Sequence, residues 1–226
     1  MHVAHGERRA LIGPNGAGKT TLFNVIAGDL AATSGQITLF GQSVTRMPVH
    51  RRVGLGLRRT YQKSALFDTL TVAQNLYLGL LGPNRGHFNM VSLAHKDAAR
   101  SRRVAGVAES VALTDRLEAP AGELSHGERR QLEFGLAIAS EPRLVMLDEP
   151  MSGLSPEERA AIVKLLNALP SDVTLLLIEH DMDVALNIAK RVTVLHEGRI
   201  IAEGSTEEIS ANPMVQQVYL GERVDE

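Results

Sequence analysis

Short apolar runs separated by polar segments recur along the chain. Residues 10–12, 144–147 and 173–178 form unbroken apolar or nearly apolar runs, as expected of parallel strands that are buried on both faces. Apolar residues at helical spacing follow Thr21 and Ser155, so a helix is predicted after two of these runs. Strands that alternate with helices predict an α/β fold with a mainly parallel sheet.

Smaller β elements are predicted on either side of the middle of the chain. Residues 35–41 are typical of a short strand between glycine turns. Residues 192–195 and 199–202 flank the turn His-Glu-Gly and predict a β-hairpin. The chain then continues in short helical pieces.

A helical insertion is predicted between the first and second apolar runs. A helical pattern begins at Thr71, and residues 95–113 form a polar segment rich in helix. The sequence Gly-Pro-Asn-Arg-Gly at 82–86 separates the two and predicts a flexible surface loop. Residues from about 64 to 122 are therefore expected to be helical.

The first apolar run leads directly into a glycine-rich loop. This order fits the phosphate-binding pattern G-x-x-x-x-G-K-[ST] between a strand and a helix. Glycines permit positive φ angles, which let backbone N–H groups converge on an anion. Lys19 supplies a positive charge for phosphates, and the Thr20 hydroxyl is a hard oxygen ligand for Mg²⁺. The alternative is a glycine-rich turn with a stray lysine. The loop residues are Gly13, Pro14, Asn15, Gly16, Ala17, Gly18, Lys19 and Thr20, followed by Thr21.

Ionisable residues follow the two later apolar runs. Residues 144–147 end in Asp148 and Glu149, at the carboxyl end of a predicted strand, where α/β sheets bind ligands. Because an unpaired buried charge is costly, this pair favours a binding role over an exposed turn. The next run is followed closely by His180, and a histidine in such a position is by itself more often structural than catalytic.

Two helix starts carry the spacing of a capping box. Ser125 with Glu128, and Ser155 with Glu158, fit the pattern S-x-x-E, and Pro156 suits the first helical turn. Such a cap explains these residues structurally. A helix N-terminus with a serine hydroxyl and a neighbouring glycine also suits an anion, so the first of the two can serve both roles.

A basic segment at residues 47–59 favours a solvated face. It contains Arg51, Arg52, Arg58 and Arg59. A nucleic-acid site would need interleaved aromatic residues or a recognisable fold, and the segment shows neither. The net charge of -2 gives no further argument for nucleic acid or an anionic membrane.

Composition excludes several classes of protein. The chain has 226 residues, enough for a full α/β core, and no cysteine, so disulfides and thiolate chemistry are impossible. No apolar stretch approaches the ~20 residues that span a bilayer, and the start lacks the apolar core of a signal peptide. A role at a membrane would therefore depend on a partner that is already there.

Taken in order, these motifs resemble the nucleotide-binding subunit of an ABC transporter. The phosphate loop is followed by Gln62 as the glutamine loop and by residues 124–128 (LSHGE) as the signature. Asp148 and Glu149 then end a Walker B strand, and His180 matches the switch histidine. The signature departs from the commonest Leu-Ser-Gly-Gly form at its third residue, where this chain has His126 and the family tolerates other residues.

Several segments resemble the ATPases of branched-chain amino acid importers more closely. Urea importers of that group look much the same. The lipopolysaccharide exporter ATPase shares the terminal Tyr-Leu-Gly-Glu but lacks the Arg-Thr-aromatic-Gln form. The segments are RRTYQ at 58–62, LTVAQNL at 70–76, IEHDM at 178–182 and VYLGE at 218–222.

The resemblance implies a single ABC ATPase domain over residues 1–226. Residues 1–63 and 123–205 would form the P-loop NTPase (RecA-like) core with β elements. Residues 64–122 would form the helical subdomain and residues 206–226 a helical tail. Family members carry a longer segment before the phosphate loop, with an aromatic residue that stacks on adenine, and that residue has no counterpart in this chain.

The resemblance also implies an ATPase mechanism with ATP and Mg²⁺. Two copies, identical or paralogous, would pair head-to-tail. Lys19 and the loop amides would hold the phosphates, and Ser125 and Gly127 of the opposite copy would close on the γ-phosphate. Glu149 would polarise the attacking water and His180 would contact both water and phosphate. The implied metal site is Thr20, Gln62 and Asp148, and the implied catalytic set is Glu149, His180, Gln62 and Lys19.

The implied partners are transmembrane permease subunits at the cytoplasmic face of the inner membrane and, indirectly, a solute-binding protein. No nucleic acid is expected. The alternatives are an ABC ATPase acting on nucleic acid or the ribosome, an ATPase of the lipopolysaccharide-exporter type, and a non-enzymatic subunit with a degenerate site. Ser155 stands where many relatives have aspartate, which keeps the helix cap but removes a charge from the loop between the two sites.

Overall fold

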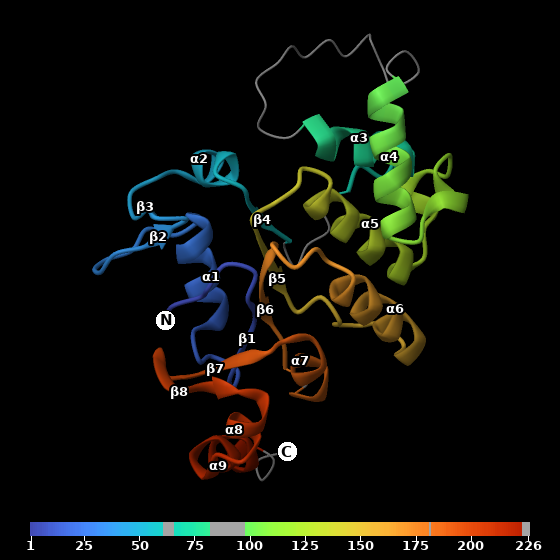
Figure 1. Cartoon of the computed structure of the whole chain (residues 1–226). Helices are drawn as coiled ribbons and strands as arrows, with labels where there is room; N and C mark the ends of the chain where they lie inside the picture. Colours follow the sequence, from blue (N-terminus) through green and yellow to red (C-terminus); the bar gives the residue numbers. More distant parts are fainter. Residues whose placement is uncertain (61–65, 82–97, 181, 223–226) are drawn as a thin grey trace.

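A six-stranded sheet forms the centre of the computed structural model, which describes residues 1–60, 66–81, 98–180 and 182–222 (Figure 1). Its strand order is β4-β5-β6-β1-β7-β8. Neighbouring strands are parallel except for the antiparallel hairpin of β7 and β8. The predicted α/β fold with a mainly parallel sheet is therefore confirmed. The strands are β1 (Arg8–Ile12), β4 (Leu57–Arg59), β5 (Leu144–Asp148), β6 (Thr174–Ile178), β7 (Arg191–His196) and β8 (Arg199–Ser205).

Strand register aligns the ends of the three central strands. Leu11 of β1 lies opposite Ile178 of β6 on one side and Thr193 of β7 on the other. Asp148 at the end of β5 also lies opposite Ile178. Because these strands are parallel, the groups that follow β5, β6 and β1 are delivered to one edge of the sheet.

Alternate residues of each central strand pack against different layers. Leu11 belongs to a buried cluster with Phe23 of helix α1, whereas its neighbours Ala10 and Ile12 belong to a second cluster with residues from helices α6 and α7. Figure 1 shows α1 on one side of the sheet and α6 and α7 on the other. Burial of one such side chain contributes about 1.5–3 kcal/mol. Both faces are covered, which explains the unbroken apolar runs.

Helices also form a separate layer beyond the sheet. Helices α3 and α4 pack against α5 (Figure 1). The helical patterns predicted after Thr71 and within residues 95–113 are confirmed, while the loop predicted at 82–86 lies outside the described residues. The division at 64–122 stays a prediction. The helices are α1 (Lys19–Ala27), α2 (Val49–Gly54), α3 (Val72–Leu81), α4 (Ala98–Ser110), α5 (His126–Ile138), α6 (Pro156–Asn167), α7 (Met182–Ile188), α8 (Thr206–Ser210) and α9 (Pro213–Glu222).

The first half of the chain contains less β structure than its sequence predicts. The strand expected at 35–41 is only β2 (Thr38–Leu39), paired with β3 (Gln42–Ser43). Phe40 and the following glycine both have positive φ, so the chain turns before the strand can extend.

Among the described helices, none combines the length and apolar content needed to cross a membrane.

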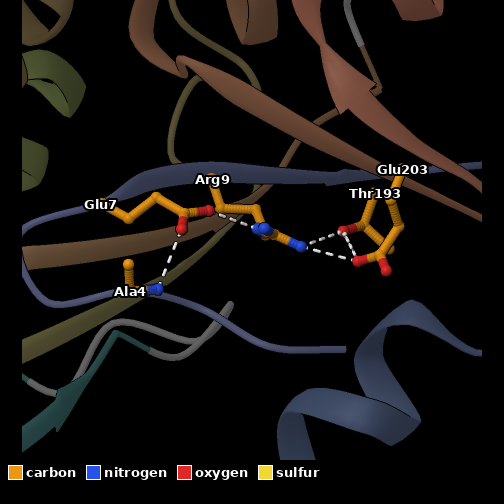
Figure 2. Close-up of polar contacts among 5 residues, drawn as sticks. All are labelled: Ala4, Glu7, Arg9, Thr193 and Glu203. Atoms are coloured by element: carbon orange, nitrogen blue, oxygen red, sulfur yellow. Dashed lines mark hydrogen bonds and ion pairs between the residues drawn. The ribbon is translucent and has the colours of Figure 1, made fainter.

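A buried ion network ties β1 to the hairpin, as Figure 2 shows. Arg9 of β1 is only 4% exposed, and its Nε donates to Glu7 Oε1 at 2.6 Å. Its Nη1 donates to Thr193 Oγ1 of β7 at 3.0 Å and to Glu203 Oε1 of β8 at 2.6 Å. Two carboxylates and a hydroxyl therefore compensate one buried guanidinium, as burial of a charge requires.

The basic segment is not the solvated face that its composition favours. Arg52 is 2% exposed, and its guanidinium donates to the carbonyl oxygens of Val25 and Ile26 at 2.7 Å and of Met47 at 2.8 Å. The bonds to Val25 and Ile26 satisfy carbonyls at the C-terminal end of α1, which the helix itself leaves without partners. Arg59 is buried as well, against acidic residues near the sheet edge. The interpretation as a solvated face is therefore wrong for both residues.

We expect Arg52→Ala to lower the free energy of unfolding by about 2–3 kcal/mol, because it leaves buried carbonyls of α1 without a donor. Urea denaturation followed by circular dichroism measures this loss. Arg51 on the same helix is exposed, so Arg51→Ala should change stability by less than about 0.5 kcal/mol. Equal effects of the two substitutions would contradict the capping role of Arg52.

Candidate functional site

The predicted phosphate loop follows β1 and ends in the first turn of α1. Gly13, Gly16 and Gly18 all have positive φ, of 148°, 77° and 98°, as predicted. At Gly13 a side chain is also excluded by space, because a Cβ would collide with the carbonyl oxygen of Leu195 on β7. The loop can therefore keep this path only with glycine at that position.

The hairpin supports the loop from one side. The N–H of Gly198, in the turn between β7 and β8, donates to the carbonyl oxygen of Ala17 at 2.9 Å. A cavity of about 520 Å³ opens beside the loop, which is within the usual size of a small-ligand pocket. It is lined by Pro14, Asn15, Gly16 and Ala17 of the loop and by His196, Glu197, Gln217 and Val218.

Lys19 lies folded over the loop rather than pointing into solvent. The residue is 5% exposed, and its Nζ donates to the carbonyl oxygens of Gly13 at 2.5 Å and Pro14 at 2.9 Å. These acceptors compensate the buried ammonium group. Thr20 and Thr21 follow on the first turn of α1. The loop thus presents a positive charge and a helix N-terminus together, which is the requirement for binding phosphate.

Glu149 and His180 meet at the carboxyl ends of β5 and β6. His180 Nε2 lies 2.6 Å from Glu149 Oε1. Glu149 has a φ of 51°, uncommon for a residue with a side chain, and its N–H donates to the carbonyl oxygen of Ile178 at 3.0 Å. The sequence alone favours a structural role for His180, and only the resemblance places it in one site with Glu149. The structure brings the two side chains together.

Asp148 is nearly completely buried at the same edge. Asp148 is 3% exposed. Burial raises the pKa of its carboxyl group, and the neighbouring Arg59 guanidinium opposes that change. Oδ2 accepts from Arg59 Nη2 at 3.2 Å, but Oδ1 has no hydrogen-bond partner within the part of the chain that the structure describes. A buried carboxylate oxygen with unused capacity suits a hard cation such as Mg²⁺. Gln62, the third predicted ligand, lies outside the described residues.

The signature residues begin α5, and the predicted capping box is confirmed. Ser125 Oγ accepts from the N–H of Glu128 at 3.2 Å, and Glu128 Oε2 accepts from the N–H of Ser125 at 2.8 Å. The N–H of Gly127 donates to Glu158 Oε1 at 2.9 Å. Glu158 Oε2 also accepts from the N–H of Ser155, so one carboxylate joins the starts of α5 and α6.

Sequence reasoning missed the positioning roles of Arg59 and Glu179, and it expected Glu158 only as a helix cap, without its bond to Gly127. Glu179 is 4% exposed, and its Oε1 accepts from the N–H of Met151 at 3.2 Å, which holds the chain just after Glu149. Glu179 stands beside His180 in the sequence, and Arg59 stands close to Gln62. Their proximity to motifs is the only signal in the sequence, because their partners come from other elements.

A family model described as ABC transporter matches residues 1–152. A second, described as branched-chain amino acid ATP-binding cassette transporter, matches residues 199–225. The transport ATP-binding protein BraF of Pseudomonas aeruginosa is 37% identical over 94% of this chain and 86% of its own length. LivG of Salmonella typhimurium is 36% identical over 98% of this chain and 90% of its own length. Both are named as high-affinity branched-chain amino acid transport proteins.

Other similar proteins include a different kind of transporter subunit and a solved structure. The lipopolysaccharide export protein LptB of Acidithiobacillus ferridurans is 33% identical over 99% of this chain and 89% of its own length. The crystal structure of MJ1267, an ATP-binding cassette of an ABC transporter, is 30% identical, with a TM-score of 0.84 over 97% of this chain and 90% of that one.

We expect the bonds of Glu158 to make stability depend on pH. Hydrogen bonds from Ser155 and then Gly127 lower the pKa of Glu158 from its ordinary value of 4.5. A lowered pKa in the folded state stabilises the protein above pH 4.5, and this contribution disappears as the pH falls through the folded value. Glu158→Gln should therefore reduce the melting temperature at pH 7, and the difference from the parent should shrink as the pH falls below 4.5.

The control is Glu157→Gln, which removes a neighbouring exposed carboxylate from the same turn of α6. It should change the melting temperature less at pH 7. A Glu158→Gln effect that does not shrink as the pH falls below 4.5 would contradict the role of the ionised carboxylate.

Proposed function

The chain belongs to the ABC transporter family as an ATP-binding ATPase subunit, and we propose that it powers the import of branched-chain amino acids. The observation that carries the mechanism is the meeting of three groups at one sheet edge. They are the phosphate loop after β1, the carboxylates after β5 and the histidine after β6. Phosphoryl transfer requires positioning and charge neutralisation, and this edge offers both.

We propose that the phosphates of ATP lie on the loop of residues 13–20. The loop N–H groups and the start of α1 would bind the phosphate oxygens. Lys19 would turn from the carbonyls of Gly13 and Pro14 toward the β- and γ-phosphates, which offer it stronger, charged acceptors. Gly13 would keep the backbone close enough for these contacts.

A magnesium ion is proposed between the C-terminal end of β5 and the N-terminal end of α1. Thr20 and Asp148 would hold it, together with Gln62, and the unused Oδ1 of Asp148 supports this assignment. The ion would supply charge neutralisation between the β- and γ-phosphates. All three proposed ligands offer hard oxygen atoms, which Mg²⁺ prefers.

Glu149 is proposed to polarise the attacking water, with His180 orienting it and contacting the γ-phosphate. The distance of 2.6 Å between His180 Nε2 and Glu149 Oε1 supports their action as a pair. General-base assistance contributes typically 10²–10⁴-fold to a rate. The signature residues Ser125 and Gly127 would act in the site of a second subunit, where the start of α5 faces the γ-phosphate.

The proposed assembly contains a second ATPase subunit, identical or paralogous, and membrane-embedded permease subunits. Closure of the two ATPase subunits on ATP and their reopening would move the permease between its inward and outward states. This chain would lie on the cytoplasmic face of the membrane. A solute-binding protein would contribute indirectly by delivering the amino acid to the permease.

The choice of solute rests on the two relatives named for branched-chain amino acid transport and on the match of residues 199–225. The similarity to LptB supports lipopolysaccharide export as the second candidate, at lower identity. A role on nucleic acid is disfavoured because the chain has a net charge of -2 and its arginines at 52 and 59 are buried.

We expect Glu149→Gln to lower ATP turnover by about 10²–10⁴-fold while ATP binding is retained, because the substitution removes only the proposed base. Saturating Mg-ATP should then hold this variant as a dimer, which light scattering detects as a doubled mass. Glu157→Gln should hydrolyse ATP at the parent rate. Hydrolysis by Glu149→Gln at the parent rate would show that Glu149 is not the base.

We also expect ATP-driven leucine uptake from the complete transporter. The tagged chain would be purified from membranes with its bound permease and reconstituted in vesicles with the solute-binding protein. Uptake of labelled leucine should require ATP and should stop in the Glu149→Gln complex. A complex that moves no branched-chain amino acid, or copurification with RNA or DNA in place of a membrane protein, would contradict the proposal.

A further inference from the structure

Arg59 is the last residue of β4, the edge strand beside β5. Its side chain is 5% exposed although it is charged, and its Cζ lies over the buried ring of Phe23 on α1, 5.8 Å from the ring centroid. A guanidinium in such a position is held by packing as well as by hydrogen bonds. Its direction is therefore set before any ligand binds.

The guanidinium of Arg59 joins β5 to α1. Nη2 donates to Asp148 Oδ2 at 3.2 Å, and Nη1 donates to Asn24 Oδ1 at 2.6 Å and Asp29 Oδ2 at 3.0 Å. Asp148 is the proposed metal ligand on β5. Helix α1 begins with Lys19 and Thr20 of the phosphate loop. One side chain thus ties the two elements that carry the metal ligands.

The contacts leave a particular oxygen of Asp148 for a ligand. Oδ2 is engaged by Arg59, whereas Oδ1 is buried and has no hydrogen-bond partner in the described residues. Fixing one oxygen of a planar carboxylate fixes the direction of the other. The same guanidinium also faces the carboxylate of Asp29, which helps to hold it in place.

We propose that Arg59 is a positioning residue for the metal site: it holds Asp148 by Oδ2 so that Oδ1 is presented to Mg²⁺. The inference rests on the proposed ATPase site. Partners that orient a metal ligand typically contribute 10–100-fold to metal affinity. The role requires a planar fork that bonds two groups at once, which lysine does not have.

The test measures how nucleotide binding depends on Mg²⁺, without hydrolysis. A fluorescent, non-hydrolysable ATP analogue is titrated onto the whole protein in EDTA and over a range of Mg²⁺ concentrations. For Arg59→Lys, the Mg²⁺ concentration that gives half of the full binding enhancement should rise about 10-fold. Binding in EDTA should stay within about twofold of the parent, because the phosphate loop is untouched.

The matched control is Arg58→Gln on the same strand. Arg58 donates to the backbone carbonyl oxygens of Val53 and Leu57 rather than to a carboxylate. Its substitution should leave the Mg²⁺ requirement unchanged. Asp29 is exposed and pairs with Arg59, so Asp29→Asn removes one of the bonds that hold the guanidinium. This second variant should also raise the Mg²⁺ requirement, by a smaller factor. It keeps the proposal testable if Arg59→Lys does not fold.

An unchanged Mg²⁺ requirement in Arg59→Lys and Asp29→Asn would overturn the proposal, and a lowered one would show that Arg59 competes with the metal instead. Equal weakening of binding with and without Mg²⁺ would show a purely structural role. A parent protein that does not bind the analogue at all would instead refute the proposed ATPase site, so the two failures are distinguishable.

Discussion

Parallel pairing of β5, β6 and β1 is the constraint on which the candidate site depends. These strands are covered on both faces by two buried clusters, so their backbone groups must bond to one another. Their register brings the ends of all three to the same edge. The loop after β1, Asp148 at the end of β5 and His180 after β6 therefore lie together although long segments separate them in the sequence.

Burial of ionised groups is the second feature that shapes the molecule. Arg9, Arg52 and Arg59 are each buried, and each bonds to carboxylates or to backbone carbonyls. Such groups are costly unless they are compensated. The compensation is structural for Arg9 and Arg52, which join strands and cap a helix. The carboxylates that compensate Arg59 include that of Asp148, the residue proposed to bind the metal.

A single carboxylate connects the starts of α5 and α6. Glu158 accepts from Ser155 at the start of α6 and from Gly127 at the start of α5. Helix α6 follows the loop after Glu149, and α5 carries the signature. This link gives a physical path between the proposed base of one site and the signature that would serve the other, even though the loop has serine in place of aspartate at 155.

The sequence by itself determined the elements whose cause is local. Unbroken apolar runs predicted β5 and β6, the S-x-x-E spacing predicted the caps of α5 and α6, and the glycines at 13, 16 and 18 predicted positive φ, because each follows from neighbouring residues. Only the tertiary structure decided that Arg52 and Arg59 are buried and that Glu158 bonds to Gly127. Their partners are distant in sequence, and long-range contacts leave no local pattern. The buried Oδ1 of Asp148 is likewise visible only once the neighbouring strands and α1 surround it.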